Sequence, residues 1–550
     1  MKPSVTVQVA AGSYADVLTE LVDARVASRL AARDATLWGP EAEQEAAIRL
    51  DWVDLPRSSR PLLAEIDALR AELWGEGIDR VVLCGMGGSS LAPEVITRTY
   101  GMDLLVLDST EPSVVERALR GDLQRTVVVV SSKSGTTVET DSQRRAFEEA
   151  FARVGIDAAS RMVAVTDPGS ELAEYAAESG YRRVFAANPH VGGRYSALTA
   201  FGLVPSGLAG VDVAELLDEA DDVAAALAAD EPTNPALLLG AVLGGLPGDV
   251  TGGPQRRRDK IVIADADSGV TGLGDWAEQL IAESTGKQGR GVLPVPVEGP
   301  DAPEVLTAAD DVSVAFVVDA IRAEDQPLVV VPEAAAGTPV AAVAGPLGGQ
   351  LLLWETAAAV AGRLLGINPF DQPDVESAKN AARGLLDHQP APEPAGFVEA
   401  AVEVRAPAGL LDGVGTLDGA VAALLDRVGD DGYVAVMAYL DPERDAPLRT
   451  GRAALARRTG RPVTFGWGPR FLHSTGQYHK GGPAQGAYLQ LTTEASTDVP
   501  VPDRPFSFGT LVAAQAAGDA RVLADHDRPV LRLHLREPVA GVAQVLEALR

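Results

Sequence analysis

Short apolar runs alternate along most of the chain with longer stretches in which apolar and charged positions recur at helical spacing. The clearest run is 127–130, four consecutive valines, which predicts a strand buried on both faces. Further strands are expected at 80–84, 104–107, 161–165, 182–185, 260–264, 311–317 and 327–331. Strands that alternate with helices indicate doubly wound parallel sheets, whose ligands bind at the carboxyl ends of the strands.

The same pattern divides the chain into domains. We expect an N-terminal helical arm over 1–60, a first doubly wound domain over 61–205 and a second over 206–387. Residues 388–396 are rich in proline and predict a linker. Residues 397–550 predict a third α/β domain, with strands at 398–404, 433–439, 462–466, 486–492 and 530–535.

Composition narrows the class of protein. The chain has 47 Lys and Arg against 77 Asp and Glu, a formal charge of −30, which disfavours a nucleic-acid or anionic membrane partner. Its one cysteine, Cys84, allows no internal disulfide and no cysteine metal cluster, as is typical of a reducing cytoplasm. We expect a cytoplasmic protein, because no secretion signal and no uninterrupted membrane-spanning run is seen.

The valine run ends in a turn of hydroxyl-bearing residues that opens a helix. Ser132, Ser134, Thr136 and Thr137 supply O–H donors there, and Lys133 supplies a positive charge. Backbone N–H groups at the start of the helix add further donors. Because arginine provides nearly all other positive charge in the chain, a lysine here favours a phosphate cradle. The alternative is an ordinary capped helix with a solvated lysine.

A second turn rich in small residues follows the strand at 80–84. Its sequence is Gly85-Met-Gly-Gly-Ser89, in which glycines allow close approach of a ligand and Ser89 is a donor. With Asp108 after the next strand, this segment loosely resembles a dinucleotide-binding fingerprint. Ser90 stands where that fingerprint has its third glycine. A sugar-phosphate loop is therefore the favoured interpretation.

Two later segments offer groups for acid–base chemistry. Arg194 follows two glycines and precedes a Tyr-Ser pair, so its surroundings leave open backbone. Gln279 and Glu283 are four residues apart on a predicted helix over 275–284 and share one face. A carboxylate near the helix C-terminus is expected to be more basic, which suits a general base. The alternatives are a surface arginine and a solvated glutamate.

The remaining candidates lie further along the chain. Pro369 and Pro373 predict a turn, and Lys379 lies on the helix expected after it. The segment 468–482 contains His473 and His479, whose spacing does not suit a zinc site and which have no cysteine nearby. No metal is therefore expected.

Taken together, these segments resemble the phosphoglucose isomerase (glucose-6-phosphate isomerase) family. The Gly-Gly-Ser loop, Ser-Lys-x-x-x-Thr-x-x-Thr, Gly-Gly-Arg-Tyr-Ser, Gln-x-x-x-Glu-Ser-x-Gly-Lys and Phe-Asp-Gln-x-x-Val-Glu-x-x-Lys occur in the family's order. One departure concerns His473-Ser-Thr-Gly-Gln477, which follows Lys379 instead of preceding it. In this respect the chain resembles the isomerase half of transaldolase–isomerase fusions.

The resemblance implies two sugar-isomerase (flavodoxin-like) domains and a homodimer with shared sites. It implies isomerisation of glucose 6-phosphate to fructose 6-phosphate through a cis-enediol, with no cofactor. In this scheme Glu283 moves the proton, Arg194 stabilises the enediolate, and His473 and Lys379 assist ring opening. The implied substrate-binding residues are Gly88, Ser89, Ser132, Lys133, Ser134, Thr137, Thr140, Gly193, Gln279, Gln372 and His479.

Three points stay open at this stage. His479 is the second choice for the ring-opening histidine, and the histidine can come from the same chain or from a partner subunit. A non-catalytic sugar-phosphate sensor would need the cradle but not Glu283, Arg194 and Lys379 together. An isomerase that also accepts mannose 6-phosphate remains compatible with the sequence.

Overall fold

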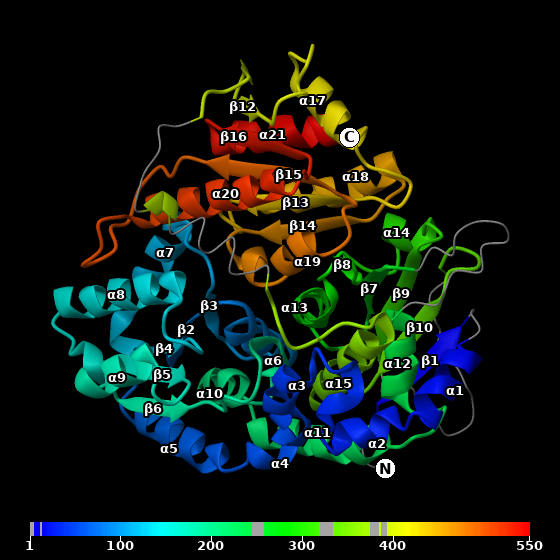
Figure 1. Cartoon of the computed structure of the whole chain (residues 1–550). Helices are drawn as coiled ribbons and strands as arrows, with labels where there is room; N and C mark the ends of the chain where they lie inside the picture. The colour runs from blue at the N-terminus through cyan, green and yellow to red at the C-terminus, as the bar shows by residue number, and fades with distance from the viewer. Residues whose placement is uncertain (1–4, 11–13, 245–257, 320–333, 374–383, 387–392) are drawn as a thin grey trace.

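The computed structural model describes residues 5–10, 14–244, 258–319, 334–373, 384–386 and 393–550. These residues form three α/β units, each built on one sheet, which occupy the lower left, the right and the top of Figure 1. Among the helices described, none combines the length and the apolar character needed to span a membrane.

The first unit is a five-stranded sheet in the order β3-β2-β4-β5-β6, with every neighbouring pair parallel. Its strands are β2 (Arg80–Gly85), β3 (Leu105–Leu107), β4 (Thr126–Ser131), β5 (Met162–Thr166) and β6 (Arg183–Ala186). Its helices are α5 (Leu62–Gly75), α6 (Leu91–Thr99), α7 (Pro112–Leu119), α8 (Val138–Arg153), α9 (Glu171–Glu178) and α10 (Ala200–Ala209). The prediction of a doubly buried strand at the valine run is confirmed, because every residue of β4 is buried.

The second unit has the strand order β1-β10-β9-β7-β8. Its strands are β1 (Thr6–Ala10), β7 (Lys260–Ala266), β8 (Leu293–Val297), β9 (Val312–Val318) and β10 (Val340–Ala344). Its helices are α11 (Val213–Leu227), α12 (Pro235–Gly244), α13 (Leu273–Thr285), α14 (Pro303–Leu306) and α15 (Leu347–Leu365). All strand pairs are parallel except β1 with β10.

The N-terminal arm contributes directly to this second sheet. Its strand β1 pairs antiparallel with β10 and is followed by the helices α1 (Ala15–Asp23), α2 (Val26–Ala31), α3 (Glu43–Arg49) and α4 (Leu55–Ser58). The arm therefore ties the start of the chain to a sheet formed much later in the sequence.

The boundary expected at 206 falls inside α10, which contacts α5 and α6 of the first unit.

Two strands of the second sheet were not predicted. β8 contains Pro294 and Pro296, which argue against a central strand but are tolerated here because β8 lies at the sheet edge. β10 is a short segment of valine and alanine without strong alternation. The strand expected at 327–331 lies outside the described residues.

The third unit has six strands in the order β11-β12-β16-β15-β13-β14. They are β11 (Phe397–Glu399), β12 (Val402–Arg405), β13 (Tyr433–Tyr439), β14 (Val463–Trp467), β15 (Gly486–Thr493) and β16 (Val530–Leu535). The helices are α17 (Leu417–Leu425), α18 (Thr450–Thr459), α19 (Gly476–Gly481), α20 (Phe508–Asp525) and α21 (Pro538–Leu549). The single strand expected at 398–404 is instead the antiparallel pair β11 and β12, because the chain reverses at Ala400, which has a left-handed φ of 46°.

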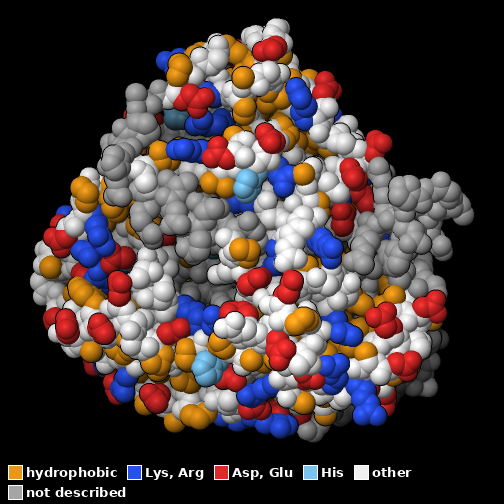
Figure 2. Space-filling model, viewed as in Figure 1, with side chains coloured by type: hydrophobic (Ala, Val, Ile, Leu, Met, Phe, Trp, Pro, Cys, Tyr) orange, Lys and Arg blue, Asp and Glu red, His pale blue; other side chains and the backbone are white. Residues whose placement is uncertain are grey.

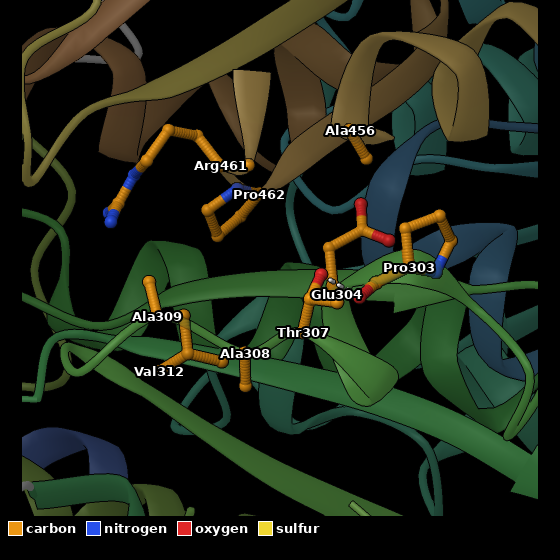
Figure 3. A pocket seen from close by; sticks show the side chains of 10 residues that line it. Pro303, Glu304, Thr307, Ala308, Ala309, Val312, Ala456, Arg461 and Pro462 are labelled. Atoms are coloured by element: carbon orange, nitrogen blue, oxygen red, sulfur yellow. Dashed lines mark hydrogen bonds between the residues drawn. The ribbon is translucent and has the colours of Figure 1, made fainter. Parts of the chain in front are cut away.

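The third unit packs against both other units. Phe471, Tyr478 and residues of β13 share one apolar cluster with β7, β8 and β9 of the second unit. Val501 and Phe508 belong to the apolar cluster of the first unit. Figure 3 shows part of the seam with the second unit, where Glu304 and Thr307 face Ala456 and Pro462 across a narrow pocket. The seam is therefore a packed interface and not only a linker contact.

The surface charge is dispersed. On the face shown in Figure 2, acidic side chains are spread among basic ones instead of gathering in one patch. The formal charge of −30 thus gives no single acidic surface in this view.

Candidate active site

The hydroxyl-rich turn folds as a compact loop at the carboxyl end of β4. Ser132 Oγ accepts a hydrogen bond from the Gly135 N–H at 3.2 Å and lies 3.2 Å from Thr137 Oγ1. Thr137 occupies the N-cap position of α8 but makes no side-chain cap bond. Thr140 Oγ1 is buried and has no hydrogen-bond partner among the described residues. Hydroxyl and amide donors therefore converge where a helix begins, as an anion site requires.

Lys133 lies in this turn but points toward neighbouring loops. Its ammonium group is 2.7 Å from Asp167 Oδ2 and donates to the Pro189 carbonyl at 3.2 Å. Burial lowers the pKa of Lys133, and Asp167 opposes that shift. These two partners use two of the three N–H donors of the ammonium group, which leaves one for a phosphate oxygen.

The glycine loop after β2 packs closely against three other segments. A Cβ added at Gly88 would fall 2.0 Å from the Gly193 carbonyl oxygen, and one at Gly87 would fall 2.7 Å from Gln279 Nε2 and 3.0 Å from His473 Cβ. Gly87 also has a left-handed φ of 56°. The structure therefore brings together Gly87, Gly88, Gly193, Gln279 and His473, which are far apart in the sequence.

Arg194 is buried at the centre of this group and is not a surface arginine. Its guanidinium group lies 3.2 Å from Glu283 Oε2 and donates to Ser284 Oγ and to Gln372 Oε1, each at 3.1 Å. It also donates to the backbone carbonyls of Pro369 and Asp371, at 2.7 and 2.8 Å. These bonds fix the orientation of the guanidinium plane, with Nη1 directed toward Glu283.

Glu283 lies in the last turn of α13 and is only 4% exposed, so it is not a solvated glutamate. Gln279 Nε2 is 3.3 Å from Glu283 Oε1 and 2.8 Å from the His473 carbonyl oxygen. Gln279 Oε1 is buried without a partner in the described part of the chain. The shared helical face predicted for Gln279 and Glu283 thus faces the glycine loop and Arg194.

His473 reaches this group from the third unit of the same chain. Its Nε2 lies 3.0 Å from Glu139 Oε1 on α8, and Gln515 Nε2 donates to that same oxygen at 2.7 Å. Glu139 was not among the residues predicted for the site. Its place in the first turn of α8, directly after the hydroxyl-rich turn, is the only sequence signal that could have identified it.

His479 has different surroundings. It is 2% exposed, its Nδ1 is 2.9 Å from Tyr433 Oη, and its ring stacks on that of Tyr433. Burial, followed by the nearby Lys480 and Arg528, lowers the pKa of His479 to about 3. The ring is therefore neutral near pH 7 and belongs to an aromatic cluster of the third unit.

A second buried cation supports the turn at 369–372. Lys287 donates to the Asp371 carbonyl at 2.6 Å and lies 2.7 Å from Asp371 Oδ1. Burial, with Arg194 as the next cause, lowers the pKa of Lys287 to about 7. Lys287 and Arg194 therefore hold Asp371 and Gln372 beside Glu283. Lys379 lies outside the described residues.

Two matches to known proteins show the family of this chain. A family profile described as phosphoglucose isomerase matches residues 66–289. A probable glucose-6-phosphate isomerase from Haloquadratum walsbyi is 30% identical over 347 residues, which cover 56% of this chain and 79% of that protein. The chain belongs to the phosphoglucose isomerase family. The family resemblance inferred from the ordered motifs is confirmed.

Some other matches to this family cover less of each protein. Glucose-6-phosphate isomerase from Cyanothece sp. PCC 7425 is 33% identical over 222 residues, which are 38% of this chain and 40% of that protein. The chain thus spans about two fifths of the length of the first curated relatives it matches.

Solved structures support the fold prediction. A hypothetical protein from Thermus thermophilus has a TM-score of 0.54 and 27% identity, covering 68% of this chain and 95% of its own. A glucose-6-phosphate isomerase from Chlamydia trachomatis has a TM-score of 0.55 and 19% identity, and the match covers 70% of this chain and 90% of that protein. The predicted fold class, paired sugar-isomerase sheets with helices around them, is confirmed for the phosphoglucose isomerase part of the chain.

Proposed function

We propose that this chain is a glucose-6-phosphate isomerase that interconverts glucose 6-phosphate and fructose 6-phosphate through a cis-enediol. The observation that carries the proposal is the convergence of Arg194, Glu283, Gln279 and His473 on the Gly87–Gly88 loop. A sensor that only binds sugar phosphates would not need a buried carboxylate beside a buried guanidinium group.

The phosphate is assigned to the turn at 132–137, with Ser89 and Thr140 beside it. The support is the set of hydroxyls at the start of α8 and the buried, unpartnered Thr140 Oγ1. Phosphate oxygens are strong acceptors and satisfy such donors. Holding the phosphate there fixes the far end of the sugar relative to the reacting carbons.

Ring opening is assigned to His473. Opening requires a proton to move between O5 and O1 near neutral pH, and imidazole carries out such transfers. Glu139, 3.0 Å from the ring nitrogen, orients the imidazole, and Gln515 in turn holds Glu139. His479 is less suited to this task, because it is neutral and bonded to Tyr433. Lys379, the family's second group for this step, keeps its proposed role on sequence grounds alone.

Proton transfer between C2 and C1 is assigned to Glu283. One carboxylate removes the proton from C2 and returns it to C1, and negative charge develops on the O1–O2 pair meanwhile. Arg194, fixed by five hydrogen bonds or ion pairs, is a preorganised cation for that charge. Gln279 Oε1 is an acceptor available to a sugar hydroxyl.

The setting of the enzyme is also part of the proposal. We place it in the cytoplasm, where sugar phosphates are made and used. A homodimer is the assembly that the resemblance implies. The contacts of His473 with Glu139 and Gln279 of its own chain support a site in which the histidine comes from the same chain.

The test is an isomerase assay on the purified protein with glucose, mannose and glucosamine 6-phosphates in parallel. Turnover of glucose 6-phosphate to fructose 6-phosphate supports the proposal, and turnover of mannose 6-phosphate as well would assign the broader specificity. Tight binding of fructose 6-phosphate without any turnover would contradict the proposal and favour the sensor.

A further inference from the structure

The short 3-10 turn Arg470–His473 is held on both sides by the other two units. On its N-terminal side, the Arg470 guanidinium bonds Glu94 Oε2 and lies 3.2 Å from Asp108 Oδ2. On its C-terminal side, Ser474 Oγ donates to Glu278 Oε2 at 3.4 Å. The histidine therefore lies between two anchors, one on each neighbouring unit.

The Arg470 anchor leads directly to the glycine loop. Glu94 is on α6, the helix that follows the loop, and Asp108 follows β3. Ser90 Oγ donates to Asp108 Oδ2 at 3.4 Å and to the Gly87 carbonyl at 3.1 Å. Arg470 thus binds α6 and the loop after β3, the elements that hold Gly87 against the His473 backbone.

The charges around Arg470 explain why an arginine stands there. Glu94 and Asp108 bond it directly, and Asp275 contributes to the same field. Burial raises the pKa of Asp108 to about 6, and Arg470 opposes that rise. A planar guanidinium presents its N–H donors to such carboxylates in a fixed geometry, whereas an ammonium group is a point charge on a flexible stem.

We propose that Arg470 is a positioning residue for the isomerase reaction. By fixing the 470–474 turn to the first unit, it holds the His473 imidazole against Glu139 at the place where the sugar ring opens. Arg470 itself touches no reacting atom. The inference rests on the proposed function, because its kinetic consequence is expressed through ring opening.

The test compares Arg470→Met and Arg470→Lys with a matched control, Arg452→Met. Arg452 is also a buried arginine that joins the third unit to two carboxylates, Glu298 and Glu304, but it does so at the seam with the second unit. It is not part of the proposed site. Any general effect of losing an inter-unit arginine should therefore appear in both Met variants.

For Arg470→Met we expect kcat for glucose 6-phosphate to fall by about ten- to a hundredfold, as misplacement of a catalytic group does. KM should change by less than about threefold, because the turn at 132–137, to which the phosphate is assigned, and Glu283 are unchanged. Arg470→Lys should recover part of kcat, and Arg452→Met should keep it. An unchanged kcat in Arg470→Met, or an equal loss in Arg452→Met, would overturn the proposal.

Arg470→Met leaves carboxylates without their cation, so it can fail to fold. The triple variant Arg470→Met, Glu94→Gln, Asp108→Asn removes that excess charge. We expect it to fold and still to have the lowered kcat. Full recovery of kcat would show that Arg470 only neutralises charge, which overturns the positioning role.

A second readout does not depend on catalysis. The proton NMR signals of the His473 ring, assigned with His473→Ala, should shift in Arg470→Met and stay unchanged in Arg452→Met. Unchanged signals in both variants overturn the positioning role. If the wild type lacks isomerase activity, the proposed function fails, while these signals still decide whether Arg470 holds the histidine.

Discussion

Replacing Glu283 by glutamine removes the proposed base while keeping the size and polarity of the side chain. An amide cannot take a proton from C2. Because its size and polarity match those of the carboxylate, binding of the sugar phosphate should be retained. The substitution is local, since α13 is buried on both sides of this position and Arg194 keeps its bonds to Ser284, Pro369 and Asp371. The variant therefore separates proton transfer from binding.

The expected magnitudes follow from the two contacts of the carboxylate. Glu283 Oε2 lies 3.2 Å from Arg194 Nη1, and Glu283 Oε1 lies 3.3 Å from Gln279 Nε2. A glutamine has one acceptor oxygen, so one of these two donors loses its partner, and the buried guanidinium of Arg194 loses its counter-charge. Breaking a buried ion pair in this way costs about 3–5 kcal/mol of stability. Loss of a general base lowers kcat by about 10²–10⁴-fold, or about 3–5 kcal/mol in activation free energy.

The assay measures glucose 6-phosphate turnover by coupled detection of fructose 6-phosphate, and calorimetry measures binding of fructose 6-phosphate to the same variant. Glu355→Gln is a suitable control, because Glu355 is a second fully buried glutamate, and burial raises its pKa well above its ordinary value. The control should retain activity. Activity of Glu283→Gln within tenfold of wild type would remove Glu283 as the base.

Three further predictions test other parts of the site. Lys133→Ala should raise KM more than it lowers kcat, because phosphate binding is remote from the reacting carbons; an unchanged KM would place the phosphate elsewhere. Burial, then Asp275, raises the pKa of Glu278 from 4.5 to about 8, so the folded chain keeps a proton that the unfolded chain releases. Stability at this site therefore falls as pH rises through that window, and melting temperatures should fall more steeply in wild type than in Glu278→Gln; equal slopes would contradict this. Finally, a mixture of His473→Ala and Glu283→Gln, dissociated and reassociated, should stay inactive, whereas regained activity would show that the histidine crosses between subunits.

The sequence predicted the parts of the fold that depend on local pattern. Four consecutive valines identify β4, and the hydroxyl-rich turn after it starts α8 as expected. The spacing of Gln279 and Glu283 predicted their shared face. These features need only periodicity and turn chemistry, which a short window of residues contains.

Features that depend on distant contacts were not predictable in this way. β8 contains two prolines and is a strand only because it lies at the edge beside β7. Lys133 is predicted to bind a phosphate, and its ion pair with Asp167, 34 residues away, has no signal in the local sequence. Glu139 is one of several charged residues on α8, and its contact with His473 arises from the docking of the third unit.

The position of His473 shows how the third unit is connected to the proposed chemistry. The turn that carries this histidine is too short to define its own position, so Arg470, Ser474 and the bond from Gln279 must do so. The broad apolar seam with the second unit holds the turn near the site, and these polar contacts set its final placement. Arg194, Glu283 and the phosphate turn belong to the first two units and do not depend on that seam in the same way. Loosening the third unit would therefore withdraw the ring-opening histidine first, while the groups for phosphate binding and proton transfer stay in place.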